Sequence, residues 1–362
     1  MTDWTSEFPG LSHGTYLNSC AHGLLARRVR AALDAHLDVW QDAPDWDVFA
    51  HTIERARRSF ARLIGARPEE IALQANASTG FSSVMSAFRH GRIATLDIDF
   101  PTAGSVAQRQ AARGMQHEQL RLGPMPKAAH WAPHVKGAAL ASIPAVASFT
   151  GYRLDVAEFA REAHARDVPL MVDAFQAAGT YPIDVKRSDV DFLVTGVYKW
   201  LLAPVGLAFL YVRPDHHALV PTVGGWYGLQ EPYSFDPLGE IARDARRFEY
   251  GGPSIIGCAA AAASLDLIHE VGLASIERTN GALVERIMEK ARERKFEILT
   301  PADPRERASI VTFRVPDLER ALAACARGNV VVNPRLGGIR VSPHFYNRAA
   351  DVDRLFDVLD AA

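Results

Sequence analysis

The feature that most constrains this chain is an alternation of apolar runs and helical patterns through its middle. The helical patterns occupy residues 78–90, 103–114 and 154–167. The apolar runs are EIALQA (70–75), RIATLDI (92–98), AALASI (138–143), VPLMVDA (168–174), DFLVTG (191–196) and LAFLYV (207–212). Strands that alternate with helices predict an α/β fold with a mostly parallel sheet. The runs are continuously apolar, which is typical of strands that helices cover on both faces.

The pattern changes near residue 245, and a small C-terminal α+β domain is predicted beyond it. An apolar helix over 254–272 ends at Gly272, and a second helix follows over 274–294. Further elements are expected as strands 295–299, 309–315, 329–333 and 338–342, with helices 317–327 and 349–361. The predicted domains are an N-terminal segment that packs on the core (1–20), a large domain (21–250) and a small domain (251–362). The first 20 residues can pack against either domain.

Composition excludes several classes of protein. The net charge of −2 favours neither nucleic acid nor an anionic membrane as a partner. No stretch reaches the roughly 18 apolar residues of a membrane span. The start MTDWTSEFPG lacks the basic and apolar regions of a signal peptide. The three cysteines form no CxxC, so neither a disulfide framework nor a metal site is expected, and we predict a cytoplasmic protein.

A lysine lies among apolar residues in TGVYKWLLAPVG (195–206). Burial of Lys199 would favour its neutral amine, which is a better nucleophile and can form a Schiff base with an aldehyde. The alternative is a lysine at a strand end whose ammonium group reaches solvent, and the local sequence alone favours that alternative.

An acid ends the apolar run of VPLMVDAFQAAG (168–179). At the carboxyl end of a buried strand, Asp173 would face the crevice where α/β folds bind ligands. Its burial requires a cationic partner, and a protonated pyridine nitrogen is such a group. This acid and a Schiff-base lysine are the recurring protein contribution to pyridoxal phosphate chemistry. The alternative for Asp173 alone is a helix cap or turn residue.

A phosphate site is expected in QANASTGFSSVMSAF (74–88), which passes from strand to helix through small hydroxyl residues. Ser78, Thr79 and Gly80 would lie at the helix N-terminus, where free N–H groups and the helix dipole favour an anion. Simple helix capping by Ser78 and Thr79 is the alternative.

Together these segments resemble the class V aminotransferase family of fold-type I pyridoxal phosphate enzymes, which includes cysteine desulfurases, isopenicillin N epimerase-like proteins and kynureninases. The resemblance covers nearly the whole chain. Lys199 follows Asp173 by 26 residues, an interval similar to the family's. The motifs occur in the family's order: YLNSCAHG (16–23), NASTG (76–80), DFP (99–101), TGYRLD (150–155), VDAFQAAG (172–179), YKW (198–200), FEYGGPS (248–254) and IRVSPHFYN (339–347).

The resemblance implies roles for the residues around the cofactor. Lys199 would carry the cofactor as a Schiff base, and Asp173 would pair with its ring nitrogen. Gln176 would lie near the phenolic oxygen of the ring, and Phe100 would stack on the ring unless it is an ordinary core residue. Ser78, Thr79 and Gly80 would form the phosphate cup. Tyr198 stands where many relatives have His and would contact the phosphate, as in kynureninases, whereas Trp200 is expected to serve packing.

The resemblance also implies substrate contacts. Arg340 resembles the arginine that holds the α-carboxylate, which suits a planar bidentate donor. Its alternative is a surface arginine on a strand. Asn18 and His22 would line the substrate entrance, although surface or capping roles fit them equally well.

The sequence departs from the family at two loops. Many relatives have Gly-Thr-Pro where this chain has Gly-Gly-Pro (251–253), and their Thr reaches the phosphate across the dimer. Here Ser254 or the N–H of Gly252 would have to replace it. The loop NPRLGG (333–338) is short and lacks the nucleophilic cysteine of desulfurases. Cys325 is predicted to be a buried helix residue, which disfavours desulfurase activity.

Kynureninases carry His where this chain has Gln176. Arg335 in the short loop has two interpretations, a contact with a second acidic group of a substrate and a solvated loop arginine, and we favour the second. We therefore predict a homodimeric pyridoxal phosphate enzyme that acts on an amino acid, an aminotransferase or a related lyase. Alternatives are kynureninase-like, cysteine desulfurase or C–S lyase-like, and racemising activities, and, in a different class, a non-catalytic scaffold. No GxGxxG or GxxxxGK[ST] motif supports nucleotide binding.

Overall fold

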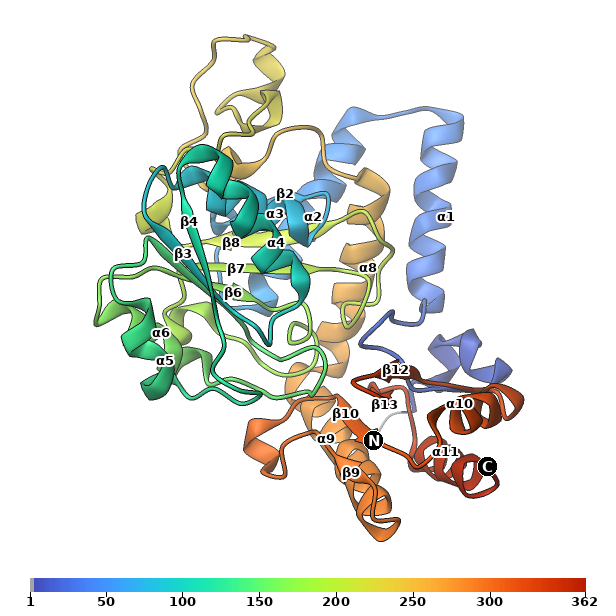
Figure 1. The fold of residues 1–362 in the computed structure, drawn as a ribbon. Helices are drawn as coiled ribbons and strands as arrows, with labels where there is room; N and C mark the ends of the chain where they lie inside the picture. The colour runs from blue at the N-terminus through green and yellow to red at the C-terminus, as the bar shows by residue number, and fades with distance from the viewer. Residues whose placement is uncertain (1–2) are drawn as a thin grey trace.

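A seven-stranded sheet forms the centre of the protein in a computed structural model that describes residues 3–362 (Figure 1). The strand order is β2-β8-β7-β6-β5-β3-β4, and only β8 runs antiparallel to its neighbours. This confirms the predicted mostly parallel sheet. The strands are β2 (Ile71–Gln74), β3 (Arg92–Leu96), β4 (Gln116–Leu120), β5 (Leu140–Pro144), β6 (Leu170–Asp173), β7 (Phe192–Gly196) and β8 (Ala208–Val212).

All six predicted apolar runs form strands of this sheet, and β4 is the strand that the pattern misses. Its sequence QHEQL is polar because β4 is an edge strand and four of its five residues are at least partly exposed. Edge strands of this kind carry little of the apolar signal by which buried strands are found.

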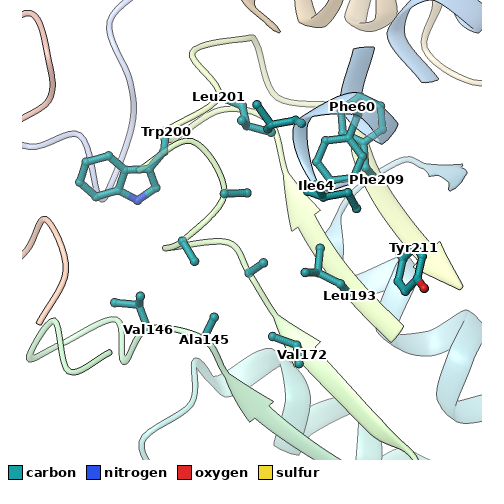
Figure 2. Packing of buried hydrophobic residues seen from close by; sticks show 14 of the residues in the cluster. Phe60, Ile64, Ala145, Val146, Val172, Leu193, Trp200, Leu201, Phe209 and Tyr211 are labelled. Carbon is teal, nitrogen blue, oxygen red and sulfur yellow. The ribbon is translucent and has the colours of Figure 1, made fainter. Parts of the chain in front are cut away.

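Helices cover both faces of the sheet, as predicted. Along β7, Phe192 and Val194 join one apolar cluster with residues of α3, whereas Leu193 joins the other cluster with Phe60 of α2. Phe60 stacks on Phe209 of β8 with ring centroids 4.2 Å apart (Figure 2). The helices of this domain are α1 (Arg27–Asp42), α2 (Trp46–Leu63), α3 (Ala77–Ala87), α4 (Pro101–Arg109), α5 (Ala128–Val135), α6 (Val156–His164), α7 (Val185–Ser188) and α8 (Ile255–Val271).

The position of α8 corrects the predicted domain boundary at 250–251. Ten of its residues are buried, and it packs against α1 and α2 of the large domain rather than in the small one. A helix that is apolar on all sides must be covered on all sides, and the large domain provides that surface. Among the described residues no single helix is long and apolar enough to cross a membrane. Only α8 and α9 (Leu273–Glu293) reach that length and composition as a pair, bent by 76°.

The small domain follows α8 in the chain and lies below the large domain in Figure 1. It has its own apolar core. Its sheet has the order β12-β13-β10-β9, with α9, α10 and α11 packed on it. Apart from α9, its elements are β9 (Glu297–Ile298), β10 (Val311–Arg314), α10 (Leu318–Arg327), β11 (Val330–Val331), β12 (Asn333–Arg335), β13 (Gly338–Val341) and α11 (Ala349–Asp360).

The N-terminal segment packs against both domains. Its strand β1 (Thr15–Tyr16) pairs in parallel with β11, apart from the four-stranded sheet. Leu17 belongs to the small core, whereas Phe8 and Cys20 belong to the large one. The segment therefore ties the two domains together next to the carboxyl edge of the central sheet.

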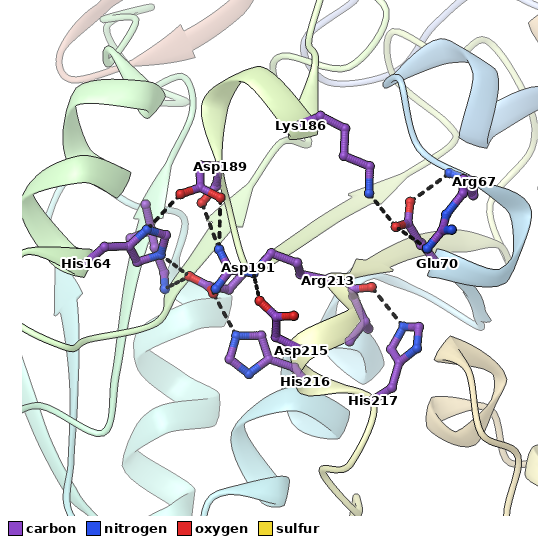
Figure 3. A network of polar contacts seen from close by, with 12 residues as sticks. Arg67, Glu70, His164, Lys186, Asp189, Asp191, Arg213, Asp215, His216 and His217 are labelled. Atoms are coloured by element: carbon purple, nitrogen blue, oxygen red, sulfur yellow. Dashed lines mark hydrogen bonds and ion pairs between the residues drawn. The ribbon is translucent and has the colours of Figure 1, made fainter.

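The opposite, amino edge of the sheet is closed by a polar network around Asp191 (Figure 3). Asp191 immediately precedes β7 and is 0 % exposed. His164, His216 and Arg213 contact its two oxygens at 2.6–2.8 Å. Its Oδ2 also accepts a hydrogen bond from the backbone N–H of Leu170 at 2.7 Å. The carboxylate therefore has a partner on every side.

Candidate active site

Lys199 lies just beyond the carboxyl end of β7 and is 7 % exposed, so the solvent-reaching interpretation is wrong. Its Nζ lies 4.2 Å from the ring centre of Phe175, 5.6 Å from that of Phe100 and 6.0 Å from that of Tyr198. Burial lowers the pKa of Lys199 to about 8, although the charge of Asp173 opposes the shift. More neutral amine is therefore present near neutral pH than an exposed lysine would have, which favours a role as nucleophile or base.

Asp173 is the last residue of β6, the strand beside β7. Its Oδ1 accepts a hydrogen bond from the N–H of Phe175 at 2.8 Å. Burial raises the pKa of Asp173, and the Phe175 N–H and the charge of Lys199 oppose this only in part. The hydrogen bond to Phe175 is a local turn contact. Because the carboxylate is deeply buried, this one hydrogen bond is not enough to stabilise its charged form.

Asp99 is a second acid at this edge that the sequence analysis did not assign. It follows β3 and is 7 % exposed; its Oδ1 accepts from the N–H of Phe100 at 2.7 Å, and its Oδ2 is buried without a partner. Burial, and then the charge of Asp173, raise its pKa well above the usual value. The rule that pointed to Asp173 applies to Asp99 as well, because both end parallel strands of one sheet.

These two acids and the lysine fit a flat ring with a protonated nitrogen. A cation between the carboxyl groups would satisfy the unpartnered oxygen of Asp99 and offset the burial of Asp173. Phe100, at the N-cap of α4, is 46 % exposed and lines the cavity, so it is not an ordinary core residue. The cavity is lined by Asp99, Phe100, Pro144, Val146, Ser148, Asp173, Phe175, Gln176 and Lys199.

The first turn of α3 carries the expected hydroxyl residues. Asn76 is the N-cap, and its side chain accepts from the N–H of Thr79 at 3.0 Å, while the hydroxyl of Thr79 donates to the carbonyl of Asn76 at 2.7 Å. Ser78 is exposed. A Cβ on Gly80 would lie 2.7 Å from Val194 Cγ2, so the glycine lets α3 approach β7 closely. The N-terminus of α3 thus lies beside β7, the strand that precedes Lys199, although Asn76 already accepts the N–H of Thr79.

Gln176 lines the cavity, but both ends of its amide are engaged. Its Nε2 donates to the carbonyl of Cys20 at 3.0 Å, and its Oε1 accepts from the indole N–H of Trp200 at 2.8 Å. Gln176 therefore joins the N-terminal segment to the lysine-bearing loop. Trp200 is 1 % exposed and serves packing. Tyr198 is half-buried, with its ring edge-on to Phe175 at 5.0 Å.

Arg340 on β13 is 3 % exposed, so it is not a surface residue. One terminal nitrogen, Nη1, donates to the carbonyl of Ser148 at 2.6 Å, whereas Nε is buried without a partner. Burial lowers the pKa of the guanidinium. Ser148 lines the cavity, so Arg340 brings spare donors to its edge.

Asn18 and His22 differ in how closely they belong to the site. Asn18 bridges to Ser342, one residue beyond β13, and its Oδ1 is buried without a partner. His22 is exposed, with its ring 5.6 Å from that of Tyr198 and its Nδ1 2.8 Å from the carbonyl of Gly23. Asn18 thus offers an unpaired acceptor on the side of Arg340, whereas His22 lies at the rim.

The remaining candidates lie elsewhere. Ser254 is the N-cap of α8, and its hydroxyl accepts from the N–H of Gly257 at 3.1 Å. Gly252 is exposed, with the Trp226 ring 4.0 Å from where its Cβ would be. Neither lines the cavity around Lys199. Cys325 is buried in α10 within the small-domain core, which confirms its prediction.

A larger cavity, of about 840 Å³ compared with about 10 Å³ around Lys199, lies between α6 and the face of the sheet that carries Val172 and Leu193. Its charged side chains are largely paired already: Arg153 contacts Glu277 at 2.7 Å and lies over the Tyr181 ring, and Lys127 pairs with Glu306. The cavity around Lys199 is instead lined by polar atoms without partners and by groups whose pKa values are shifted. This combination is typical of a functional site. The chemistry is therefore assigned to the Lys199 cavity.

The buried lysine and buried acid at the carboxyl edge of the sheet are the groups that a pyridoxal phosphate-dependent enzyme requires. Residues 45–355 match the family described as "Aminotransferase class-V", and the chain belongs to that family. It is 32% identical over 359 residues to the uncharacterized aminotransferase YcbU of Bacillus subtilis (strain 168), covering 98% of this chain and 96% of that protein. It is 31% identical over 336 residues to isopenicillin N epimerase of Streptomyces clavuligerus, covering 85% and 83%.

A solved structure shows the same fold. The apo cysteine desulfurase from Thermococcus onnurineus NA1 superposes with a TM-score of 0.90 at 23% identity and covers 100% of this chain and 98% of its own. At that identity the likeness concerns the fold alone. The family membership makes this chain an enzyme that uses pyridoxal phosphate.

Proposed function

We propose that this enzyme acts on an α-amino acid, with Lys199 as the cofactor-bearing lysine, Asp173 as the partner of the ring nitrogen and Arg340 as the carboxylate clamp. The observation that carries the proposal is the buried Lys199, with a pKa lowered to about 8, beside two acids whose pKa values burial raises. Such opposed shifts within one cavity are typical of catalytic groups.

Each residue of the site would have its own role in binding and catalysis. The cofactor, when bound, withdraws electrons from the substrate Cα. Asp173 would keep the ring nitrogen protonated, and Phe100 would contact the ring. Ser78, Thr79 and the α3 N-terminus bind the phosphate, with Tyr198 as a further donor. Lys199, once free, takes and returns a proton at the substrate Cα. Arg340 orients the substrate through its spare donors.

The reaction that follows is proposed to be transamination or a related lyase step. Racemisation is the second candidate, because one relative at 31% identity is named an epimerase. Kynureninase-like activity is disfavoured by the departure at Gln176, where kynureninases carry His. Desulfurase activity is disfavoured by the burial of Cys325 in the small-domain core.

The visible absorption spectrum of the purified protein, before and after borohydride reduction and with peptide mapping, tests the assignment. We expect a band that reduction removes while the cofactor becomes fixed to Lys199. A protein that stays colourless with added pyridoxal phosphate would contradict the proposal and favour a non-catalytic scaffold. Screening amino acids with and without a 2-oxo acid then separates transamination, which needs the 2-oxo acid, from lyase and racemase reactions.

A homodimer with its sites near the subunit interface is also proposed. Between β8 and α8 an aromatic arm (residues 220–241) projects from the large domain (Figure 1). On it Phe235 is 75% exposed and Leu238 92%, beside the exposed Trp226 and Tyr233. Exposed apolar surface of this kind marks a protein interface, and two-fold dimers are the commonest oligomers.

Light scattering after size exclusion would test the dimer, with Phe235→Ser/Leu238→Ser as the variant expected to weaken it. A wild-type monomer at micromolar concentration would contradict this assembly. A cytoplasmic location is proposed as well, supported by the three buried cysteines, none of them in a disulfide. Fractionation of the native host would test it.

A further inference from the structure

Arg335 lies on the same face of a hairpin as Arg340. In the register of β12 and β13, Asn333 pairs with Arg340 and Arg335 pairs with Gly338. Directly paired residues of an antiparallel hairpin point to the same face, and so do residues two apart on one strand. Asn333, Arg335 and Arg340 therefore share a face.

That face looks toward the catalytic cavity. Ile339, the neighbour of Arg340 on β13, points the other way and is 0 % exposed in the small-domain core. Arg340 accordingly turns away from that core and reaches the carbonyl of Ser148, which lines the cavity. Asn333 presents a buried Oδ1 without a partner on the same side. Arg335 is exposed, as expected, but it lies on β12, on the face that also carries Arg340.

Arg335 has no acidic partner within residues 3–362. The one hydrogen bond of its side chain is from Nη1 to the carbonyl of Pro334 at 2.9 Å, and it takes part in none of the ion pairs of the described chain. Its charge nevertheless reaches the site, because together with Arg340 it helps to lower the pKa of Lys199. An unpaired guanidinium on the face that already carries Arg340 gives that face two positive charges.

We infer that Arg335 binds a second carboxylate, at the end of the substrate's side chain, so that the substrates are amino dicarboxylic acids. The inference rests on the proposed function, because Arg340 must hold the α-carboxylate. Along β13 the partner of Arg335 stands two residues from Arg340, a rise of about 7 Å. Two long side chains at that separation match a short diacid, and each guanidinium fork suits one carboxylate.

Titration calorimetry on the pyridoxal phosphate-loaded protein tests this with glutarate and pentanoate. The two acids have the same number of carbons, and only glutarate has the second carboxylate. Neither carries an amino group, so binding is measured without turnover. We expect glutarate to bind the wild-type protein at least about tenfold more tightly, which corresponds to about 1.4 kcal/mol.

Arg335→Gln should remove this preference and leave the affinity for pentanoate within about twofold, because an exposed residue is changed and the α-carboxylate contact stays. Arg335→Lys should keep part of the preference, since the charge remains without the fork. Arg327→Gln is the matched control: Arg327 is an exposed arginine of the same domain, at the end of α10, and its loss should change neither affinity.

Arg340→Lys separates this inference from the proposed function. Suppose that Arg340→Lys weakens the binding of both acids. If the wild type then shows no preference for glutarate, or if Arg335→Gln keeps that preference, only the Arg335 inference is overturned. If Arg340→Lys binds both acids as the wild type does, the α-carboxylate assignment fails and the inference falls with it.

Discussion

Two buried aspartates lie at opposite edges of the same sheet and in opposite electrostatic states. Asp191, before β7, is contacted by His164, His216, Arg213 and the N–H of Leu170 (Figure 3). Burial alone would raise its pKa, but the hydrogen bonds from the two histidines and Leu170 and the charge of Arg213 outweigh burial and lower it. Asp173, the last residue of β6, accepts one hydrogen bond from a backbone N–H and lies near the charge of Lys199, but burial outweighs both and raises its pKa.

The difference separates a structural acid from a functional one. Both carboxylates bear the desolvation cost of burial, but only Asp191 recovers that cost within the folded chain. Asp173 and Asp99 are left short of partners at the edge where parallel sheets bind ligands. Stability should therefore depend on the amino edge of the sheet and activity on the carboxyl edge.

The largest expected effect on activity comes from Lys199→Ala at the carboxyl edge. Loss of the amine that bonds the cofactor and moves the proton should reduce kcat/KM by at least about 10³-fold. The thermal midpoint should stay near that of the wild type or rise, because a desolvated amine is removed. Turnover of an amino acid at the wild-type rate would break the assignment of function to this edge.

Asp173→Asn should reduce kcat/KM by about 10²–10³-fold, because the amide cannot stabilise a protonated ring nitrogen. Its free energy of unfolding without cofactor should equal or exceed that of the wild type at pH 7, since an under-partnered charge is gone. Steady-state kinetics and urea denaturation measure the two quantities. A marked loss of stability with unchanged kinetics would show that Asp173 is a structural acid rather than a functional one.

Asp191→Asn should lower stability and leave activity nearly unchanged, the opposite of Asp173→Asn. Removal of the carboxylate leaves Arg213 and two histidines without their acceptor and should lower the free energy of unfolding by about 3–5 kcal/mol. The protein that stays folded should keep kcat/KM within about threefold, because the network lies at the far edge of the sheet. An Asp191→Asn protein as stable as the wild type would show that the network only offsets its own desolvation.

The smallest expected effect is a difference in how the free energy of unfolding depends on pH. The folded-state pKa of Asp191 is lowered, so its stabilisation is present above the unfolded pKa of about 3.9 and is lost as the pH falls through the folded pKa. Asp173 has a raised pKa, so its destabilisation grows as the pH rises above about 3.9.

Urea denaturation between pH 3 and 7, without cofactor, measures this difference, which should be of order 1 kcal/mol per unit of pKa shift. Stability should fall less steeply on acidification for Asp191→Asn than for the wild type. For Asp173→Asn it should fall less steeply as the pH rises. Parallel curves for the two variants would contradict the opposite pKa shifts.

The strands and the lysine–acid pair could be predicted because their signals are local. A continuous apolar run predicts a buried strand whatever it packs against, and an acid that ends such a run lies at the carboxyl edge. The polar edge strand β4 and the unassigned Asp99 show the limits of that reasoning. The strand β4 lacks the apolar signal, and the pKa of Asp99 is raised by its burial in the folded protein and then by the charge of Asp173, which is far away in the sequence.

The sequence by itself determined the order of strands and helices and the chemical groups at their ends, because periodicity and residue type act over short stretches of chain. Only the tertiary structure decided which groups find partners. In the folded protein Asp191 has hydrogen-bond partners, whereas Oδ2 of Asp99 has none. Ser254 caps a helix, and α8 packs in the core of the large domain. The tertiary structure also set Arg335 on the face of Arg340. Pairing, burial and register depend on contacts between residues far apart in the chain, and their free energies exist only in the folded protein.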